Sequence, residues 1–134
     1  MRHFDFIQSI ISTLEKEVDL LNIPVFSASL KEDESIAVVL TPGGEKEMYY
    51  DETYEQVFSI QINARSKNEL KIIDALNNIC NYFDSVETEG IISSNDSFST
   101  IEKETAQTTN LIGIQEDGLY IYGASFKIKL YIGG

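Results

Sequence analysis

The sequence predicts a single α+β domain over residues 1–134, with two α-helices packed on one face of an antiparallel or mixed β-sheet of about four to five strands. Two segments carry apolar residues at helical spacing, and several others alternate or run apolar as strands do. The predicted strands are joined by turns or by a single helix, an order typical of a sheet with both helices behind it. A composition of 43% hydrophobic and 24% charged residues is ordinary for a globular domain.

The first predicted helix covers residues 4–22. Its apolar positions recur every three or four residues and share one face: Phe4, Ile7, Ile11, Leu14, Val18 and Leu21. Ser9 is expected on the opposite, polar side. Asn22 and then Pro24 are expected to end the helix, because proline cannot continue its hydrogen-bond pattern.

Two strands are expected next. Residues 25–30 predict a short strand, and residues 36–41, "IAVVLT", predict a strand near the sheet centre because the run is continuously apolar and rich in β-branched residues. A turn is expected at Pro42 and the two glycines after it. Residues 48–50, "MYY", are expected to begin a second arm that leads into the next strand.

The strand predicted over residues 56–65, "QVFSIQINAR", has two unlike faces. Alternation puts apolar side chains on one of them: Phe58, Ile60, Ile62 and Ala64. The other face carries Val57, Ser59, Gln61, Asn63 and Arg65. This second face is too polar for a core, so it either faces water or meets another protein.

A second amphipathic helix is predicted over residues 67–83, directly after that strand. Ser66 and Glu69 fit a capping box, in which each side chain accepts a hydrogen bond from the other residue's amide. Cys80, the only cysteine, falls on the apolar side. It is expected to be a buried structural thiol rather than a nucleophile.

The last part of the chain predicts a hairpin. A loop is expected over residues 84–97, a strand over 98–108, a turn at Asp117 and Gly118, and a long strand over 119–132. The apolar face of this last strand comprises Tyr120, Tyr122, Ala124, Phe126, Ile128, Leu130 and Ile132. With both helices on the apolar side, the polar side chains are expected to share the open face: Ser59, Gln61, Asn63, Lys127 and Lys129.

The charge of the chain excludes several classes of partner. A formal net charge of −12 and a pI near 4.3 oppose nucleic-acid phosphates and anionic membranes, which proteins hold with lysine and arginine. A negatively charged channel still lets DNA slide through, because it does not grip it. No apolar stretch approaches the roughly 20 residues that cross a bilayer, and the first residues lack the apolar run of a secretory signal. We therefore expect a protein made in a cytoplasm, with no membrane partner.

The sequence offers little catalytic chemistry. His3 is the only histidine and lies near the chain end, so neither a serine nor a cysteine nucleophile has a well-placed base. No cysteine pair, histidine cluster or P-loop is present, and "TPGGEK" indicates a turn. In a chain with 22 acidic residues, neighbouring carboxylates indicate a solvated surface. We expect no enzyme activity, no catalytic residues, and no metal or cofactor.

The order of these segments resembles a known family. A buried "IAVVLT" strand leads to a Pro-Gly turn and an aromatic segment, then "VFSIQINARS" enters a helix, and "LIGIQEDGLYIYGASFKIKLYI" closes the chain. Over residues 5–132 this order is similar to the minor capsid or tail terminator (tail completion) proteins of long-tailed bacteriophages. The most recognisable piece is the strand that ends in Arg65 and enters the helix.

The resemblance implies a structural virion protein without catalysis. Copies of it would form a ring, usually a hexamer, that caps the head-proximal end of the tail tube, ends tube polymerisation and joins the tail to the head. Its partners would be the tail tube protein and a head–tail connector protein, with genomic DNA passing through unbound. It would be assembled in the bacterial host cytoplasm and reside at the virion head–tail junction. The candidate contact residues are Tyr49, Tyr50, Ser59, Gln61, Asn63, Arg65, Lys127 and Lys129.

Two alternatives stay open on the sequence alone. In the first, the polar face of the sheet is only its solvated side and meets no partner. The whole chain also fits a small acidic cytosolic domain that docks on a basic protein partner without catalysis. Such binding would be strongly weakened by salt.

Overall fold

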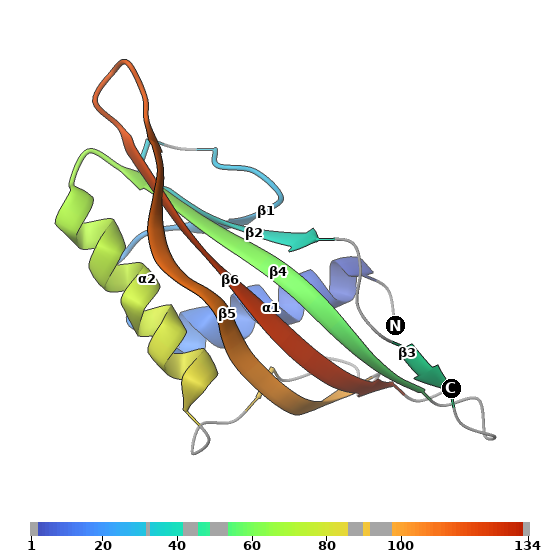
Figure 1. The fold of residues 1–134 in the computed structure, drawn as a ribbon. Helices are drawn as coiled ribbons and strands as arrows, with labels where there is room; N and C mark the ends of the chain where they lie inside the picture. Colours follow the sequence, from blue (N-terminus) through green and yellow to red (C-terminus); the bar gives the residue numbers. More distant parts are fainter. Residues whose placement is uncertain are drawn as a thin grey trace.

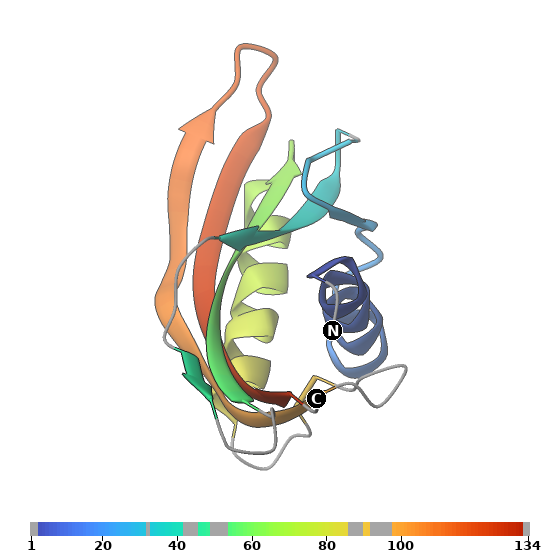
Figure 2. The ribbon, with the colours of Figure 1, turned by 90° about the vertical axis from the view of Figure 1, so that its right-hand side faces the viewer.

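The computed structural model describes residues 3–31, 33–41, 46–48, 54–85, 90–91 and 98–132. The elements follow in the order α1 (His3–Glu17), β1 (Val25–Ser27), β2 (Ser35–Thr41), β3 (Lys46–Met48), β4 (Tyr54–Ser66), α2 (Glu69–Asp84), β5 (Phe98–Ile114) and β6 (Tyr120–Ile132). The predicted α+β class is confirmed, because a mixed sheet carries both helices on one face (Figures 1 and 2).

The sheet is built around β4 and β6. Its strand order is β1-β2-β4-β6-β5, with β3 paired to β4 off this path. Among the described pairs only β1 and β2 run parallel. β2 and β3 pair in succession along β4, with Thr41 opposite Ser59 and Lys46 opposite Gln56. The expected second arm is therefore a further segment on the same side of β4, while residues 49–50 lie outside the described part of the chain.

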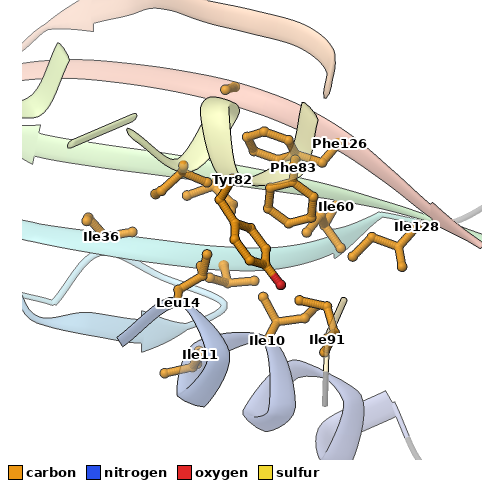
Figure 3. Close-up of a cluster of buried hydrophobic side chains, with 14 of the residues drawn as sticks. Ile10, Ile11, Leu14, Ile36, Ile60, Tyr82, Phe83, Ile91, Phe126 and Ile128 are labelled. Atoms are coloured by element: carbon orange, nitrogen blue, oxygen red, sulfur yellow. The ribbon is translucent and has the colours of Figure 1, made fainter. Parts of the chain in front are cut away.

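The apolar face of the sheet and the two helices enclose one core. The buried side chains of β4 and β6 are those that alternation predicts: Phe58, Ile60, Ile62, Ala64, Ala124, Phe126, Ile128, Leu130 and Ile132. The Phe83 ring of α2 stacks on Phe126, with centroids 4.3 Å apart. Figure 3 shows Ile10 and Leu14 of α1 pointing into this cluster from the other helix. Each large side chain buried here contributes about 1.5–3 kcal/mol, so this face of the sheet holds the fold together.

α1 is shorter than predicted. It ends at Glu17, not at residue 22. The backbone then takes left-handed conformations at Leu21 (φ 55°) and Asn22 (φ 64°). The Leu21 amide donates to Asp19 Oδ1 at 3.0 Å. This local turn gives the chain an alternative to helical hydrogen bonds, and the helix ends before Pro24 is reached.

The buried stripe of α1 also differs from the predicted one. It includes Phe6, Ile10, Ile11 and Leu14, together with Ser9 and Thr13. The expectation that Ser9 lies on the polar side is therefore wrong. The Ser9 hydroxyl donates to the Asp5 carbonyl at 2.9 Å, and the Thr13 hydroxyl donates to the Ser9 carbonyl at 2.8 Å. Because the helix backbone satisfies both hydroxyls, they enter the core without an unpaired polar group.

The predicted capping box of α2 is wrong. Asn68 is the N-cap, and its side chain accepts from an amide of the first turn at 3.3 Å. Ser66 ends β4 and donates its hydroxyl to the Glu34 carboxylate at 2.8 Å. The Glu69 carboxylate accepts from the Tyr122 hydroxyl at 2.7 Å. Tertiary contacts thus occupy both side chains of the expected box, and the cap falls to the next suitable residue.

β5 is longer than predicted, since it continues past residue 108 to Ile114. The turn that follows has Gly118 at φ 83°, as the Asp-Gly signal predicts. Two backbone hydrogen bonds close it, from Gln115 to the Leu119 carbonyl at 2.8 Å and from Gly118 to the Gln115 carbonyl at 2.9 Å. The pairing of β5 with β6 is interrupted by several register shifts. Such irregularities twist an edge strand and oppose its pairing with other sheets.

Candidate interaction surface

Both helices leave one side of the sheet open, here named the outer sheet face (Figure 2). Along β4 and β6 it consists of the alternate residues Val57, Ser59, Gln61, Asn63, Arg65, Gly123, Ser125, Lys127 and Lys129. Val39 of β2, opposite Gln61, continues it. The predicted contact residues that the structure describes therefore share this face, and Tyr49 and Tyr50 fall outside the described residues.

Amide groups and a glycine organise the centre of the outer sheet face. Gln61 Nε2 donates to Asn63 Oδ1 at 2.8 Å. A β-carbon on Gly123 would lie 2.5 Å from that Asn63 oxygen and 2.5 Å from Ile112 Cδ1. Asn110 Nδ2 also donates to the Gly123 carbonyl, at 3.0 Å. The absence of a side chain at Gly123 thus lets amides from β4 and an isoleucine from β5 close over the backbone of β6.

The outer sheet face carries charges of both signs, although the chain as a whole is strongly acidic. The register sets Lys127 opposite Glu104 and Lys129 opposite Glu102, and Lys129 Nζ lies 3.8 Å from a carboxylate oxygen of Glu55. The described cations of this face are Arg65, Lys127 and Lys129. Its carboxylates include Glu55, Glu102 and Glu104, and the register also sets Glu47 of β3 opposite Glu55. A partner approaching here meets little of the repulsion that a net charge of −12 creates elsewhere.

A separate cluster of polar groups ties the loop before β2 to α2. The Glu34 carboxylate contacts Lys71 Nζ and accepts from the Ser66 hydroxyl. The hydrogen bond from Lys71, and then that from Ser66, lower the pKa of Glu34 against the opposing effect of burial. This cluster joins two segments that are distant in sequence, and its role is to hold the fold.

Lys103 lies on the helix side of the sheet. Its Nζ donates to the carbonyls of Tyr82 at 2.8 Å and Ser85 at 2.6 Å, at the C-terminal end of α2. It also lies 4.8 Å from the centroid of the Tyr82 ring. Burial lowers the pKa of Lys103, although nearby Asp84 acts in the opposite direction. A cation placed at the carbonyl end of a helix stabilises it.

Sequence reasoning missed the end of the β5–β6 hairpin, here named the hairpin tip (residues 111–120). Three of its apolar side chains are exposed: Leu111 by 49%, Ile112 by 52% and Ile114 by 60%. The signal was present in "NLIGI", an apolar run directly before the acidic Asp-Gly turn. Because the predicted strand ended at residue 108 and the turn was predicted at Asp117 and Gly118, these side chains were left without a predicted element.

Cys80 and an open cleft lie away from the outer sheet face. Cys80 is buried, as predicted, with its Sγ 3.8 Å from Thr109 Oγ1. Within the described residues no group of His, Cys, Asp and Glu side chains could hold a metal ion, and no helix there is long and apolar enough to cross a membrane. An open cleft of about 440 Å³ lies beside the end of α1, and its lining includes Glu15 and Asp19.

Comparison with known proteins bears on the same segments. Residues 26–132 match a family model described as "Bacteriophage tail terminator protein". The matched range includes α2 and nearly the whole sheet, and therefore both the outer sheet face and the hairpin tip. No curated protein matches the chain at a significant level.

Proposed function

Because the chain belongs to the bacteriophage tail terminator family, whose members are structural proteins of the phage tail, we propose that it caps the head-proximal end of a tail tube as an oligomeric ring. The ring, expected to be a hexamer, ends tube polymerisation and joins the tail to the head. Its partners are further copies of this chain, the tail tube protein and a head–tail connector protein, at the virion head–tail junction.

The open outer sheet face carries this proposal. It presents hydrogen-bonding groups such as the Gln61–Asn63 amide pair, and both helices are packed elsewhere. Protein interfaces that form between separately folded partners are about as polar as the rest of a protein surface, so an amide-lined face suits one. Its mixture of cations and carboxylates distinguishes it from the strongly acidic remainder of the chain.

The overall charge supports the passage of DNA. A ring built from chains of net charge −12 repels phosphates, so genomic DNA moves through without being held. No catalytic step belongs to this function. Each copy contributes shape and hydrogen bonds to contacts with its neighbours, the tube and the connector.

Electron microscopy of tail tubes polymerised with the purified protein tests the proposal. The wild-type protein is expected to give tubes with a capped end and limited length. The variant Gln61→Glu with Asn63→Asp keeps side-chain size, removes the amide donors and adds two negative charges, so it should cap poorly. The matched control, Gln8→Glu with Asn22→Asp, makes the same chemical changes at exposed positions near α1 and should cap normally.

Three results would count against the proposal or against the surface assigned to it. Tubes that stay uncapped at every concentration of wild-type protein would remove the terminator role. Salt-sensitive binding to a basic protein, with no ring on any tube, would instead favour the small acidic binding domain. Normal capping by the outer-face variant would show that this face is not the contact surface.

A further inference from the structure

The hairpin tip is unusual for the surface of a monomer. Leu111, Ile112 and Ile114 are all about half exposed or more within four consecutive positions. The register places Leu111 and Ile114 on the helix side, opposite Tyr122 and Tyr120, and Ile112 on the outer side, over Gly123. Single exposed apolar residues need no explanation, but several on both sides of one hairpin mark a segment that meets another molecule. Figures 1 and 2 show the hairpin projecting beyond the ends of both helices and of the neighbouring strands. The apolar group therefore lies where a second molecule can reach it.

The projection is held in place before any partner arrives. At its base, Thr109 donates to Asn77 of α2 at 2.8 Å, and Tyr122 donates to Glu69 of α2 at 2.7 Å. Its turn is closed by two backbone hydrogen bonds. A surface already ordered in its binding shape loses little conformational entropy when it docks.

Charge identifies what receives the tip. Its turn carries Glu116 and Asp117, so its partner surface should offer cations beside apolar groups. The cleft beside α1 is lined by Glu15 and Asp19 and would repel this turn. The outer sheet face offers Lys127, which is exposed, and Lys129. An acidic turn docked there would compete with Glu104 and Glu102, which lie opposite these lysines.

The same part of the outer sheet face offers an apolar contact. Val57 lies directly opposite Lys129 in the β4–β6 pair and is only partly buried. An aliphatic side chain of the tip can pack on it while the acidic turn reaches the lysines. Both chemical characters of the tip therefore have counterparts within one patch.

We propose that the hairpin tip of one copy docks on the outer sheet face of a second copy. In this contact Ile112, on the outer side of the hairpin, packs near Val57, Ile114 flanks the contact from the other side, and the Glu116–Asp117 turn meets Lys127 and Lys129. The tip and the face are different patches of the same chain, so the contact is head-to-tail, and such contacts generate closed rings when the rotation between copies closes. The inference rests on the proposed ring and names the surfaces that build it.

Charge reversal tests the pairing directly. Glu116→Lys with Asp117→Lys should reduce the fraction of capped tubes about tenfold, because like charges then face each other across the contact. Lys127→Glu with Lys129→Glu should do the same. Combining all four substitutions restores opposite charges and should return capping close to the wild-type level. Lys16→Glu with Lys31→Glu, which makes an equal charge change outside the outer sheet face, should have little effect.

A second pair of variants tests the apolar part. Ile112→Ser with Ile114→Ser should lower capping, whereas Ile101→Ser, at a 42% exposed isoleucine of the same strand, should not. Circular dichroism of each variant checks that it is folded.

The outcomes separate this inference from the proposed function. Capping by the wild-type protein and equally by the tip variants would overturn the inference and leave the terminator role intact. The inference would also be overturned if both charge-reversal variants lost capping and the variant with all four substitutions did not regain it. The two patches would then meet different partners. No capping by the wild-type protein would instead remove the proposed function on which the inference rests.

Discussion

The two faces of the same strands perform different tasks. In β6, Phe126 is fully buried and stacks on Phe83, while the next residue, Lys127, is exposed on the outer sheet face. The inner face is apolar, closely packed and covered by two helices. The outer face is lined by amides and paired charges, and the helices leave it open. One alternating sequence thus encodes both a packed core and an open polar face, and adjacent residues can be changed to affect one without the other.

The largest expected effect comes from the inner face. Phe126→Ala removes a fully buried ring and should lower the free energy of unfolding by about 3–5 kcal/mol, because a cavity replaces the stacked ring. Lys127→Ala, one residue away, should change it by no more than about 0.5 kcal/mol. Urea unfolding followed by circular dichroism measures both. If both variants lowered the free energy of unfolding equally, the inner and outer faces would not differ in their contribution to stability.

A comparison of two lysines tests whether the position of a lysine, rather than the residue type, decides how much its loss lowers the free energy of unfolding. Lys103→Met should cost about 1–3 kcal/mol, because the carbonyls of Tyr82 and Ser85 lose a charged donor. Lys129→Met removes a partly buried pair with Glu55, at 3.8 Å, and should cost less than about 1 kcal/mol. The same unfolding assay applies. A larger loss at Lys129 would contradict the assignment of Lys103 to the part of the molecule that holds the fold.

The smallest effect concerns pH. Because the pKa of Glu34 in the folded protein is below its ordinary value of 4.5, its contact with Lys71 adds stability above that value. The gain disappears as the pH falls from 4.5 through the lower folded pKa. Glu34→Gln should therefore cost up to about 1 kcal/mol at neutral pH and progressively less as the pH falls below 4.5.

A double-mutant cycle isolates this pair. In a Lys71→Met background, Glu34→Gln should have a smaller effect at neutral pH, because its main partner is already gone. Urea midpoints at both pH values provide the measurement. The role given to this carboxylate would be refuted if Glu34→Gln lowered the free energy of unfolding by the same amount at neutral and at acidic pH.

Much of the fold is predictable because the relevant patterns are local. The period of two in β4 and β6 identifies the buried and open faces residue by residue, and the Asp-Gly pair identifies the hairpin turn. These signals depend only on neighbours in sequence. The placement of Ser59, Gln61 and Asn63 on an open face follows from them.

The sequence-based predictions fail where residues distant in sequence determine which hydrogen bonds a side chain makes. Ser66 and Glu69 have the pattern of a cap, but Glu34 and Tyr122 occupy their side chains. Ser9 reads as a surface residue, but a hydroxyl that bonds to the carbonyl four residues earlier can be buried. The apolar hairpin tip was missed because apolar residues beside a turn do not by themselves show that nothing covers them.

Cys80 has a practical consequence for studying the assembly. It is the only thiol of the chain, and it is buried against the sheet. A cysteine introduced at the surface would therefore carry a label or form a disulfide with little competition from the native residue. If copies form the proposed ring, paired cysteines on neighbouring copies would link them covalently. Partial cross-linking would then give a ladder of bands on a denaturing gel, and its largest species would give the number of copies in the ring.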